Sequence, residues 1–283
     1  MKKYAVGMQV SGHSVEAELN YADCPPGRTV DYNLADWSGF PIRRERVPIL
    51  AADGAQRAPT LGREGFACVP FAPAIADYGD DQAIDAQWRP AVEQLVQALT
   101  GADLVVSWAV NRRFSERSSD ARRTPVAAPA RRVHSDFSPS EFLTGVTHRF
   151  TVDALRRVGA VPRRWKCFNV WQPLSSPPHD VPLAVCDASS IAAQDLVPAH
   201  GILRAGDGMD FTIDLCVLRF NPAHRWYYFR DLGPQRALVF YGFDPERPAP
   251  YGIVPHSAFD DPTCPPGTPA RTSIEVRTLA VFH

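Results

Sequence analysis

The sequence predicts an α+β protein that is mainly β, with a core of the sandwich or jelly-roll type and helices packed outside one sheet. Two observations support this class. The C-terminal third carries successive β-branched and aromatic runs, FTIDLCVLRF, RWYYFRDL, RALVFYGFD and TSIEVRTLAVF. The 27 prolines are scattered through the connecting segments, as in proteins built from short antiparallel strands joined by stiff loops.

Shorter strands and the helices are expected earlier in the chain. Apolar residues recur at helical spacing over residues 82–100, where Asp80 or Asp81 can cap the helix and Gly101 can end it. The predicted strands of this part lie within YAVGMQV, VEAELNY, VPIL, FACVPF, ADLVVSWAV, WKCFNVWQPL and PLAVCD. Further helices are predicted from the capping box Ser138-Pro139-Ser140-Glu141, from Thr151 and within DASSIAAQDL.

The segment at residues 112–132 is basic and rich in Pro and Ala, which is typical of a solvated or disordered loop. It leads directly into His134, so a mobile lid over that residue is an alternative. Composition alone leaves both interpretations open.

Length and charge limit the classes of protein to which the chain can belong. A single domain over residues 1–283 fits the length and the absence of an internal repeat, while the oligomeric state does not follow from the sequence. A net charge of −1 and a pI near 6.7 give no electrostatic case for nucleic acid or an anionic membrane as partner. No apolar run is long enough to span a membrane, no signal-peptide cleavage site is evident, and the six cysteines form no CxxC pair. We therefore expect a cytoplasmic protein with free thiols.

The most informative motif is His134-Ser135-Asp136, which is followed near the C-terminal end by His256. Two imidazoles and one carboxylate suit a non-haem Fe(II) and leave coordination positions open. Because residues i and i+2 of a strand point to the same side, His134 and Asp136 can serve one ion. The motif therefore predicts an iron site, and the alternative is that both histidines are ordinary surface or core residues.

Arg271 and Ser273 form a second pair with the same spacing, a short distance after His256. A guanidinium and a hydroxyl on one strand face suit the distal carboxylate of a dicarboxylate co-substrate. The order of the two motifs therefore predicts a metal site beside an anion-binding site.

Four other residues are weaker candidates. Asn169 and Trp171 share a strand face and can line the co-substrate pocket, or they can be a structural hydrogen bond and a core indole. Arg277 shares a face with Arg271 and Ser273 and can meet a substrate carboxylate, or it can pair with Glu275 or another neighbouring acid. Tyr228 can touch the substrate, although a buried tyrosine with a partnered hydroxyl is the alternative.

Several separated segments carry a resemblance to a known family. They are RRVHSDFS, FNVWQPLSSPPHDVPLAVCDASS, HRWYYF, LVFYGFD, PHSAFDDP and ARTSIEVRTLAVF. Together they resemble the CmcJ/AsaB-like hydroxylase/desaturase family over residues 103–282, whereas residues 1–100 match loosely.

The resemblance implies an Fe(II)/2-oxoglutarate-dependent oxygenase with a double-stranded β-helix (jelly-roll) core. It implies that His134, Asp136 and His256 bind iron and that Arg271, with Ser273, holds 2-oxoglutarate, with O2 as the other co-substrate. The expected activity is oxidation of an unactivated C–H bond of a small molecule, by hydroxylation, desaturation or cyclisation, in natural-product biosynthesis.

Two departures from the family pattern bear on the substrate. Gln172 stands where the family has an arginine, and Gln235-Arg236 where it often has an acidic pair. We expect the lost guanidinium at residue 172 to remove a fixed positive charge from the substrate site. Two other functions remain open, a non-catalytic accessory protein of a tailoring enzyme and a cupin-type iron enzyme that does not use 2-oxoglutarate.

Overall fold

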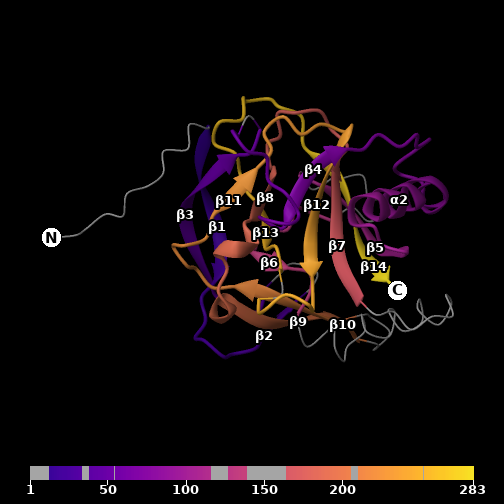
Figure 1. Cartoon of the computed structure of the whole chain (residues 1–283). Helices are drawn as coiled ribbons and strands as arrows, with labels where there is room; N and C mark the ends of the chain where they lie inside the picture. The colour runs from indigo at the N-terminus through magenta and orange to yellow at the C-terminus, as the bar shows by residue number, and fades with distance from the viewer. Residues whose placement is uncertain are drawn as a thin grey trace.

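The computed structural model describes residues 13–33, 38–53, 55–115, 127–138, 164–204, 210–250 and 252–283. Within these ranges the chain is mainly β, with two sheets and a helical segment against the smaller sheet (Figure 1). No helix of this described part is long and apolar enough to cross a membrane. The predicted strand YAVGMQV and the helices predicted from Ser138 and Thr151 lie mainly or wholly outside the described residues.

The larger sheet has nine strands among the described residues, in the spatial order β1-β3-β11-β8-β13-β6-β10-β9-β2. In chain order their bounds are β1 (Ser14–Ala22), β2 (Val30–Asn33), β3 (Ile42–Ala51), β6 (His134–Ser135), β8 (Leu183–Cys186), β9 (Leu196–Arg204), β10 (Asp210–Leu218), β11 (Trp226–Tyr228) and β13 (His256–Ala258). The strands β6 and β13, which carry the two candidate histidine ligands, lie side by side near the middle of this order.

The smaller sheet has five strands in the described part of the chain, in the spatial order β4-β12-β7-β14-β5. Their bounds are β4 (Phe66–Pro70), β5 (Leu104–Phe114), β7 (Arg164–Pro173), β12 (Arg236–Phe243) and β14 (Thr272–Phe282). The strands β7 and β14 are neighbours in this sheet and carry four further candidate site residues, Asn169, Trp171, Ser273 and Arg277. Arg271 directly precedes β14.

The predicted helix over residues 82–100 is confirmed as one continuous helical segment that covers the outer face of the smaller sheet (Figure 1). It comprises α1 (Asp81–Ala83), the π-helical turn η1 (Ile84–Trp88) and α2 (Arg89–Thr100). The Asp80 side chain accepts a hydrogen bond from the backbone of Gln82 at the start, and Gly101, at φ 69°, ends the helix. The wider turn directly precedes Pro90, which has no N–H to donate to the carbonyl four residues earlier.

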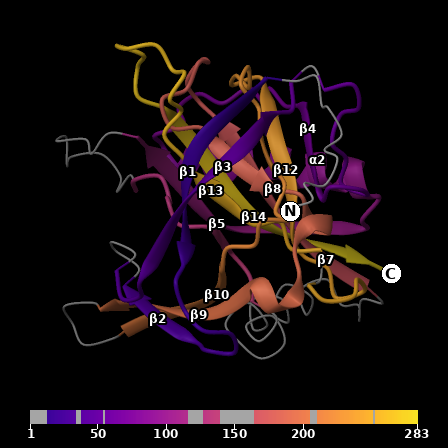
Figure 2. The ribbon, with the colours of Figure 1, turned by 90° about the vertical axis from the view of Figure 1, so that its left-hand side faces the viewer.

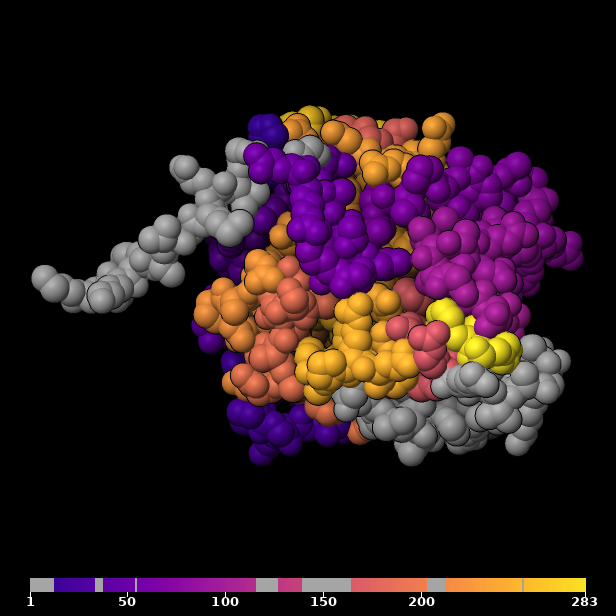
Figure 3. Space-filling model, viewed as in Figure 1, coloured from indigo at the N-terminus to yellow at the C-terminus, as the bar shows by residue number. Residues whose placement is uncertain are grey.

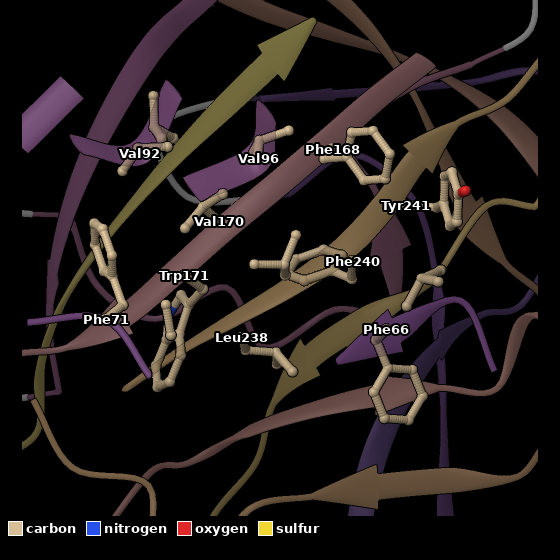
Figure 4. Close-up of a cluster of buried hydrophobic side chains, with 14 of the residues drawn as sticks. Phe66, Phe71, Val92, Val96, Phe168, Val170, Trp171, Leu238, Phe240 and Tyr241 are labelled. Atoms are coloured by element: carbon tan, nitrogen blue, oxygen red, sulfur yellow. The ribbon is translucent and has the colours of Figure 1, made fainter. Parts of the chain in front are cut away.

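The main apolar core lies on both sides of β7. Figure 4 shows Val92 and Val96 of α2 beside the strand that carries Phe168 and Val170, while Trp171 projects from its other side with Leu238 and Phe240 of β12. Because both faces of β7 are covered, every residue from Cys167 to Pro173 is buried, instead of buried and exposed residues alternating. On the surface, the segment from β4 to α2 covers the upper and right-hand part of the view in Figure 3.

A second core lies under the N-terminal hairpin. The strands β1 and β3 pair in antiparallel register and cross in front of β8 and β13 (Figure 2). Alternate residues of β1 are buried against the larger sheet, and the Trp226 indole donates a 2.7 Å hydrogen bond to the Tyr21 hydroxyl. The hairpin therefore buries one face of the central strands and leaves their other face to the smaller sheet.

The structure corrects two sequence predictions of local structure. Arg112 and Arg113 belong to β5 and form ion pairs with Asp81 and Glu275, so residues 112–114 are strand and not loop. Residues 116–126 of the predicted loop lie outside the described residues. The helix predicted within DASSIAAQDL is two separate 3-10 turns, η2 (Ala188–Ser190) and η3 (Ala193–Asp195), because the short segment has no further turn to extend into before β9.

Gln172 points away from the interior between the sheets, which makes the expectation of a lost substrate-binding charge wrong. Its Oε1 accepts a 2.8 Å hydrogen bond from the Trp88 indole, and its Nε2 donates to the carbonyl of Pro234 at 2.7 Å. The side chain is fully buried between β7 and η1. Residue 172 therefore joins the sheet to the helix and does not face the candidate site.

We predict that Gln172→Leu lowers the free energy of unfolding by about 1–3 kcal/mol, because it leaves the buried Trp88 N–H without an acceptor. Urea denaturation measures the change. The matched control is Gln97→Leu, since Gln97 lies on the exposed face of α2 and we expect a change within about 0.5 kcal/mol. Equal stability of the two variants would contradict the contact.

Candidate metal centre and co-substrate pocket

Strand pairing brings together the three predicted metal ligands. In the antiparallel pair of β6 and β13, His134 lies directly opposite His256, and their ring centroids are 4.3 Å apart. Asp136 follows β6 two residues after His134 and lies on the same side. The candidate ligand atoms of all three residues lie within 4.8 Å of one another. One small ion can therefore contact all three side chains.

Backbone carbonyls fix the orientation of both imidazoles. His134 Nδ1 lies 2.7 Å from the carbonyl oxygen of Arg132, and His256 Nδ1 lies 3.3 Å from that of Val254. A hydrogen on each Nδ1 satisfies these carbonyls and leaves the lone pair on Nε2. The two Nε2 atoms lie 3.8 and 3.9 Å from the carboxylate oxygens of Asp136, so both lone pairs face the same space.

The electrostatics favour the protonation states that a ferrous ion requires. Burial, with a contribution from His256, lowers the pKa of His134 to about 3, so its imidazole is neutral at neutral pH. Burial by itself raises the pKa of Asp136, but the adjacent Arg277 guanidinium holds that pKa well below its usual range. A neutral imidazole and an ionised carboxylate are the forms that bind a metal.

Asn169 and Arg277 both contact Asp136, which differs from the roles expected from the sequence. Arg277 Nη2 donates a 2.8 Å hydrogen bond to Asp136 Oδ1, and Asn169 Nδ2 donates to Asp136 Oδ2. Asn169 therefore lies at the candidate ligands instead of along the co-substrate pocket. For Arg277, the alternative of pairing with a neighbouring acid is the one the structure contains, and that acid is a candidate ligand.

Arg271, Ser273 and Trp171 lie together beside the histidines. Arg271 Nη1 donates to Ser273 Oγ at 3.0 Å, and the guanidinium lies 5.4 Å from the centre of the Trp171 ring. These residues share one pocket with the two histidines. Its lining residues are Arg113, Ala130, His134, Trp171, Leu183, His256, Ala258, Arg271 and Glu275. The pocket therefore connects the candidate metal ligands to the candidate anion site.

The Arg271 guanidinium is buried without an acidic partner among the described residues. It is 1% exposed, and its Nε makes no hydrogen bond within the described part of the chain. Burial lowers the pKa of Arg271 to about 10, and the Arg113 guanidinium contributes to that shift. A buried cation without a counter-ion is costly, so the arrangement fits an anionic ligand that supplies the missing carboxylate.

The main chain at Arg271 is fixed by contacts that the sequence did not reveal. Its backbone N–H donates to Ser115 Oγ at 2.8 Å and to Asp180 Oδ1 at 2.9 Å, and Ser115 Oγ donates to Asp180 Oδ2 at 2.6 Å. The ion pair of Arg113 and Glu275 in the same pocket was also missed. Alternation along the strand places Glu275 on the same face as Ser273, but nothing in the sequence indicated that Arg113 is the partner of Glu275.

Tyr228 does not join this group. It is 2% exposed and packs against Phe259 in the core under the N-terminal hairpin. Tyr227 faces the other way and lies beside Phe66 in the core between the sheets. Neither tyrosine lines the pocket of the two histidines.

Comparisons with known proteins agree with this geometry. The model of a family described as an oxidoreductase/YMDC permease-like domain matches residues 16–282. The chain is 32% identical over 202 residues to the Fe(II)/2-oxoglutarate-dependent dioxygenase nvfI of Aspergillus novofumigatus, covering 71% of this chain and 68% of that protein. It is 30% identical to the hydroxylase/desaturase efuI of Hormonema carpetanum, over 79% of each chain.

A solved structure of the iron and alpha-ketoglutarate-dependent endoperoxidase NvfI superposes with a TM-score of 0.79 at 28% identity, over 95% of this chain and 98% of that one. Similarity of this extent confirms the predicted mainly β class with a jelly-roll core and helices outside one sheet.

Proposed function

The chain belongs to the hydroxylase/desaturase family of Fe(II)/2-oxoglutarate-dependent dioxygenases, and we propose that His134, Asp136 and His256 hold the iron of this enzyme. The observation that carries the assignment is the convergence of their ligand atoms within 4.8 Å. Two neutral imidazoles and one carboxylate leave one side of a six-coordinate iron free for 2-oxoglutarate and O2. When bound, the iron and its co-substrates supply the oxidation of an unactivated C–H bond.

Each residue of the proposed site has a task that its contacts support. The carbonyls of Arg132 and Val254 keep a hydrogen on each Nδ1, so that the ligand nitrogen is Nε2 in both histidines. Asp136 contributes the single negative charge of the ligand set. The buried Phe240 ring, whose centroid lies 4.9 Å from that of His256, shields one side of that ligand from water.

We assign the distal carboxylate of 2-oxoglutarate to Arg271 and Ser273. A buried guanidinium without an acidic partner among the described residues is the feature expected of a carboxylate anchor. The face of Trp171 limits where the carbon chain between the two carboxylates can lie. An iron enzyme that does not use 2-oxoglutarate has no need of such an anchor, so this feature argues against the cupin-type alternative.

The substrate is proposed to be a small organic molecule of a natural-product pathway. This follows from the relatives, which are named as hydroxylase/desaturases and as an endoperoxidase. Hydroxylation, desaturation and cyclisation differ in which C–H bond the protein presents to the iron, and all three are consistent with one set of ligands.

We predict that His134→Ala and His256→Ala each abolish stoichiometric iron binding, because two remaining ligands do not retain the ion through desalting. Iron is measured by elemental analysis after anaerobic loading, and turnover by succinate formation. The matched control is His224→Gln, since His224 is a buried histidine bonded to Asp195 outside the site. Full iron occupancy in both alanine variants would contradict the assignment.

A second prediction concerns the co-substrate. Wild-type enzyme should bind 2-oxoglutarate about 10–100-fold more tightly than 2-oxopentanoate, which has the same chain length but no distal carboxylate. Arg271→Met should remove this preference and leave iron occupancy unchanged. The charge-transfer absorption of the iron complex, titrated without oxygen, measures both affinities. A variant that keeps the wild-type preference would place the anchor elsewhere.

A further inference from the structure

We propose that Asn169 and Arg277 form a cross-strand clamp on Asp136, which fixes the orientation of this carboxylate as an iron ligand. The proposal rests on the assignment of Asp136 to the iron and deepens it. Arg277 is thereby a positioning residue, which acts on the iron through Asp136, and is not a contact for the substrate.

The strand register places the two donors side by side. In the antiparallel pair of β7 and β14, Asn169 lies directly opposite Arg277. Residues opposite each other project from the same face of a sheet, so both side chains reach toward the larger sheet. Each takes one oxygen of Asp136, Arg277 Nη2 at 2.8 Å from Oδ1 and Asn169 Nδ2 bonded to Oδ2.

The clamp links the two sheets at the candidate metal centre. Asp136 follows β6 of the larger sheet, whereas both of its donors lie on the smaller sheet. With one donor on each oxygen, the carboxylate cannot rotate about its last bond without breaking a hydrogen bond in the protein interior. The same two contacts therefore tie the smaller sheet to the candidate ligand and fix the direction of its carboxylate.

Charge distinguishes the two donors. Asp136 is buried, and an ionised carboxylate without a partner is costly in such a place. Arg277 supplies the positive charge before iron binds, and Asn169 supplies a second hydrogen bond without charge. Once iron is bound, the guanidinium withdraws electron density from Asp136 and makes the iron less electron-rich.

The same contacts leave Arg277 poorly placed to bind a substrate carboxylate. Its Nη2 donates to Asp136 and its guanidinium lies 5.8 Å from the Phe137 ring centre, although its Nε makes no hydrogen bond within the described part of the chain. A substrate anion here would compete with the iron ligand for the guanidinium. The pocket that contains the histidines and Arg271 is not lined by Arg277.

The test uses two variants of the clamp in the full-length protein, Arg277→Met and Asn169→Leu, with Arg277→Lys as the charge-conserving variant. Loss of such outer contacts weakens metal binding by roughly 10–100-fold. We expect both clamp variants to raise the Kd for Fe(II), measured without oxygen by chelator competition, by about tenfold or more. Arg277→Lys should recover part of the loss.

A spectroscopic readout separates the clamp from a merely structural role. Arg277→Met should move the charge-transfer band of the Fe(II)·2-oxoglutarate complex to longer wavelength, because a more electron-rich iron gives up an electron at lower energy. Asn169→Leu and Arg277→Lys, which keep the charge, should leave the band near its wild-type position. The control is Arg225→Met, which removes the ion pair of Arg225 with Asp187, outside the candidate ligands. It should change neither the Kd for Fe(II) nor the position of the band.

Wild-type Fe(II) affinity together with an unshifted band in Arg277→Met would overturn the clamp. If Arg277→Met does not fold, Asn169→Leu still tests the clamp, because this variant keeps the ion pair of Arg277 with Asp136. An unchanged Fe(II) affinity of Asn169→Leu would also overturn the proposal. If His134→Ala binds Fe(II) as tightly as wild type, the iron assignment itself fails. The two failures are therefore distinguishable.

Discussion

The structure of the site depends on the antiparallel pairing of β6 with β13, two very short strands from distant parts of the chain. Their register sets His134 opposite His256, and alternation along the chain adds Asp136 on the same side. Neither strand is long enough to hold this register by itself, so it is held by longer neighbours. The strand β10 lies beyond β6, and β8 lies beyond β13. Shifting either short strand by one residue would turn its histidine to the opposite face.

The smaller sheet supplies the cationic half of the site through β14. Alternation along this strand places Ser273, Glu275 and Arg277 on the inner face, with Arg271 just before it. The register against β7 is regular throughout, whereas the irregularity in the pairing with β5 falls beside Ala109, which has a positive φ of 55°. The distortion is thus absorbed at the edge strand, and the spacing between the arginines is kept.

The sequence predicted those parts of the site that follow from alternation within one strand. That rule grouped His134 with Asp136 and Arg271 with Ser273, and the structure brings each pair together. It could not choose between Tyr227 and Tyr228, because β11 has an apolar core on each face. The orientation of Gln172 could have been predicted, since alternation along β7 puts it on the other face of the strand from Asn169 and Trp171. Asp136 could not be predicted as the partner of Arg277, because it follows a strand of the other sheet and the packing of the two sheets brings distant segments together.

Buried Arg271 and partly buried Arg277 show how an acidic partner bears on the role of a cation. Arg271 and Arg277 face the same interior, yet Arg277 is paired with Asp136, while Arg271 has no acidic partner among the described residues. Burial without pairing lowers the pKa of Arg271 to about 10, whereas the pKa of Arg277 is raised because the interaction with Asp136 outweighs the effect of burial. A protein that folds around an unpaired guanidinium retains a free-energy cost, and a ligand carboxylate can relieve it. This difference is the basis on which we propose Arg271 for the co-substrate and Arg277 for the candidate metal ligand Asp136.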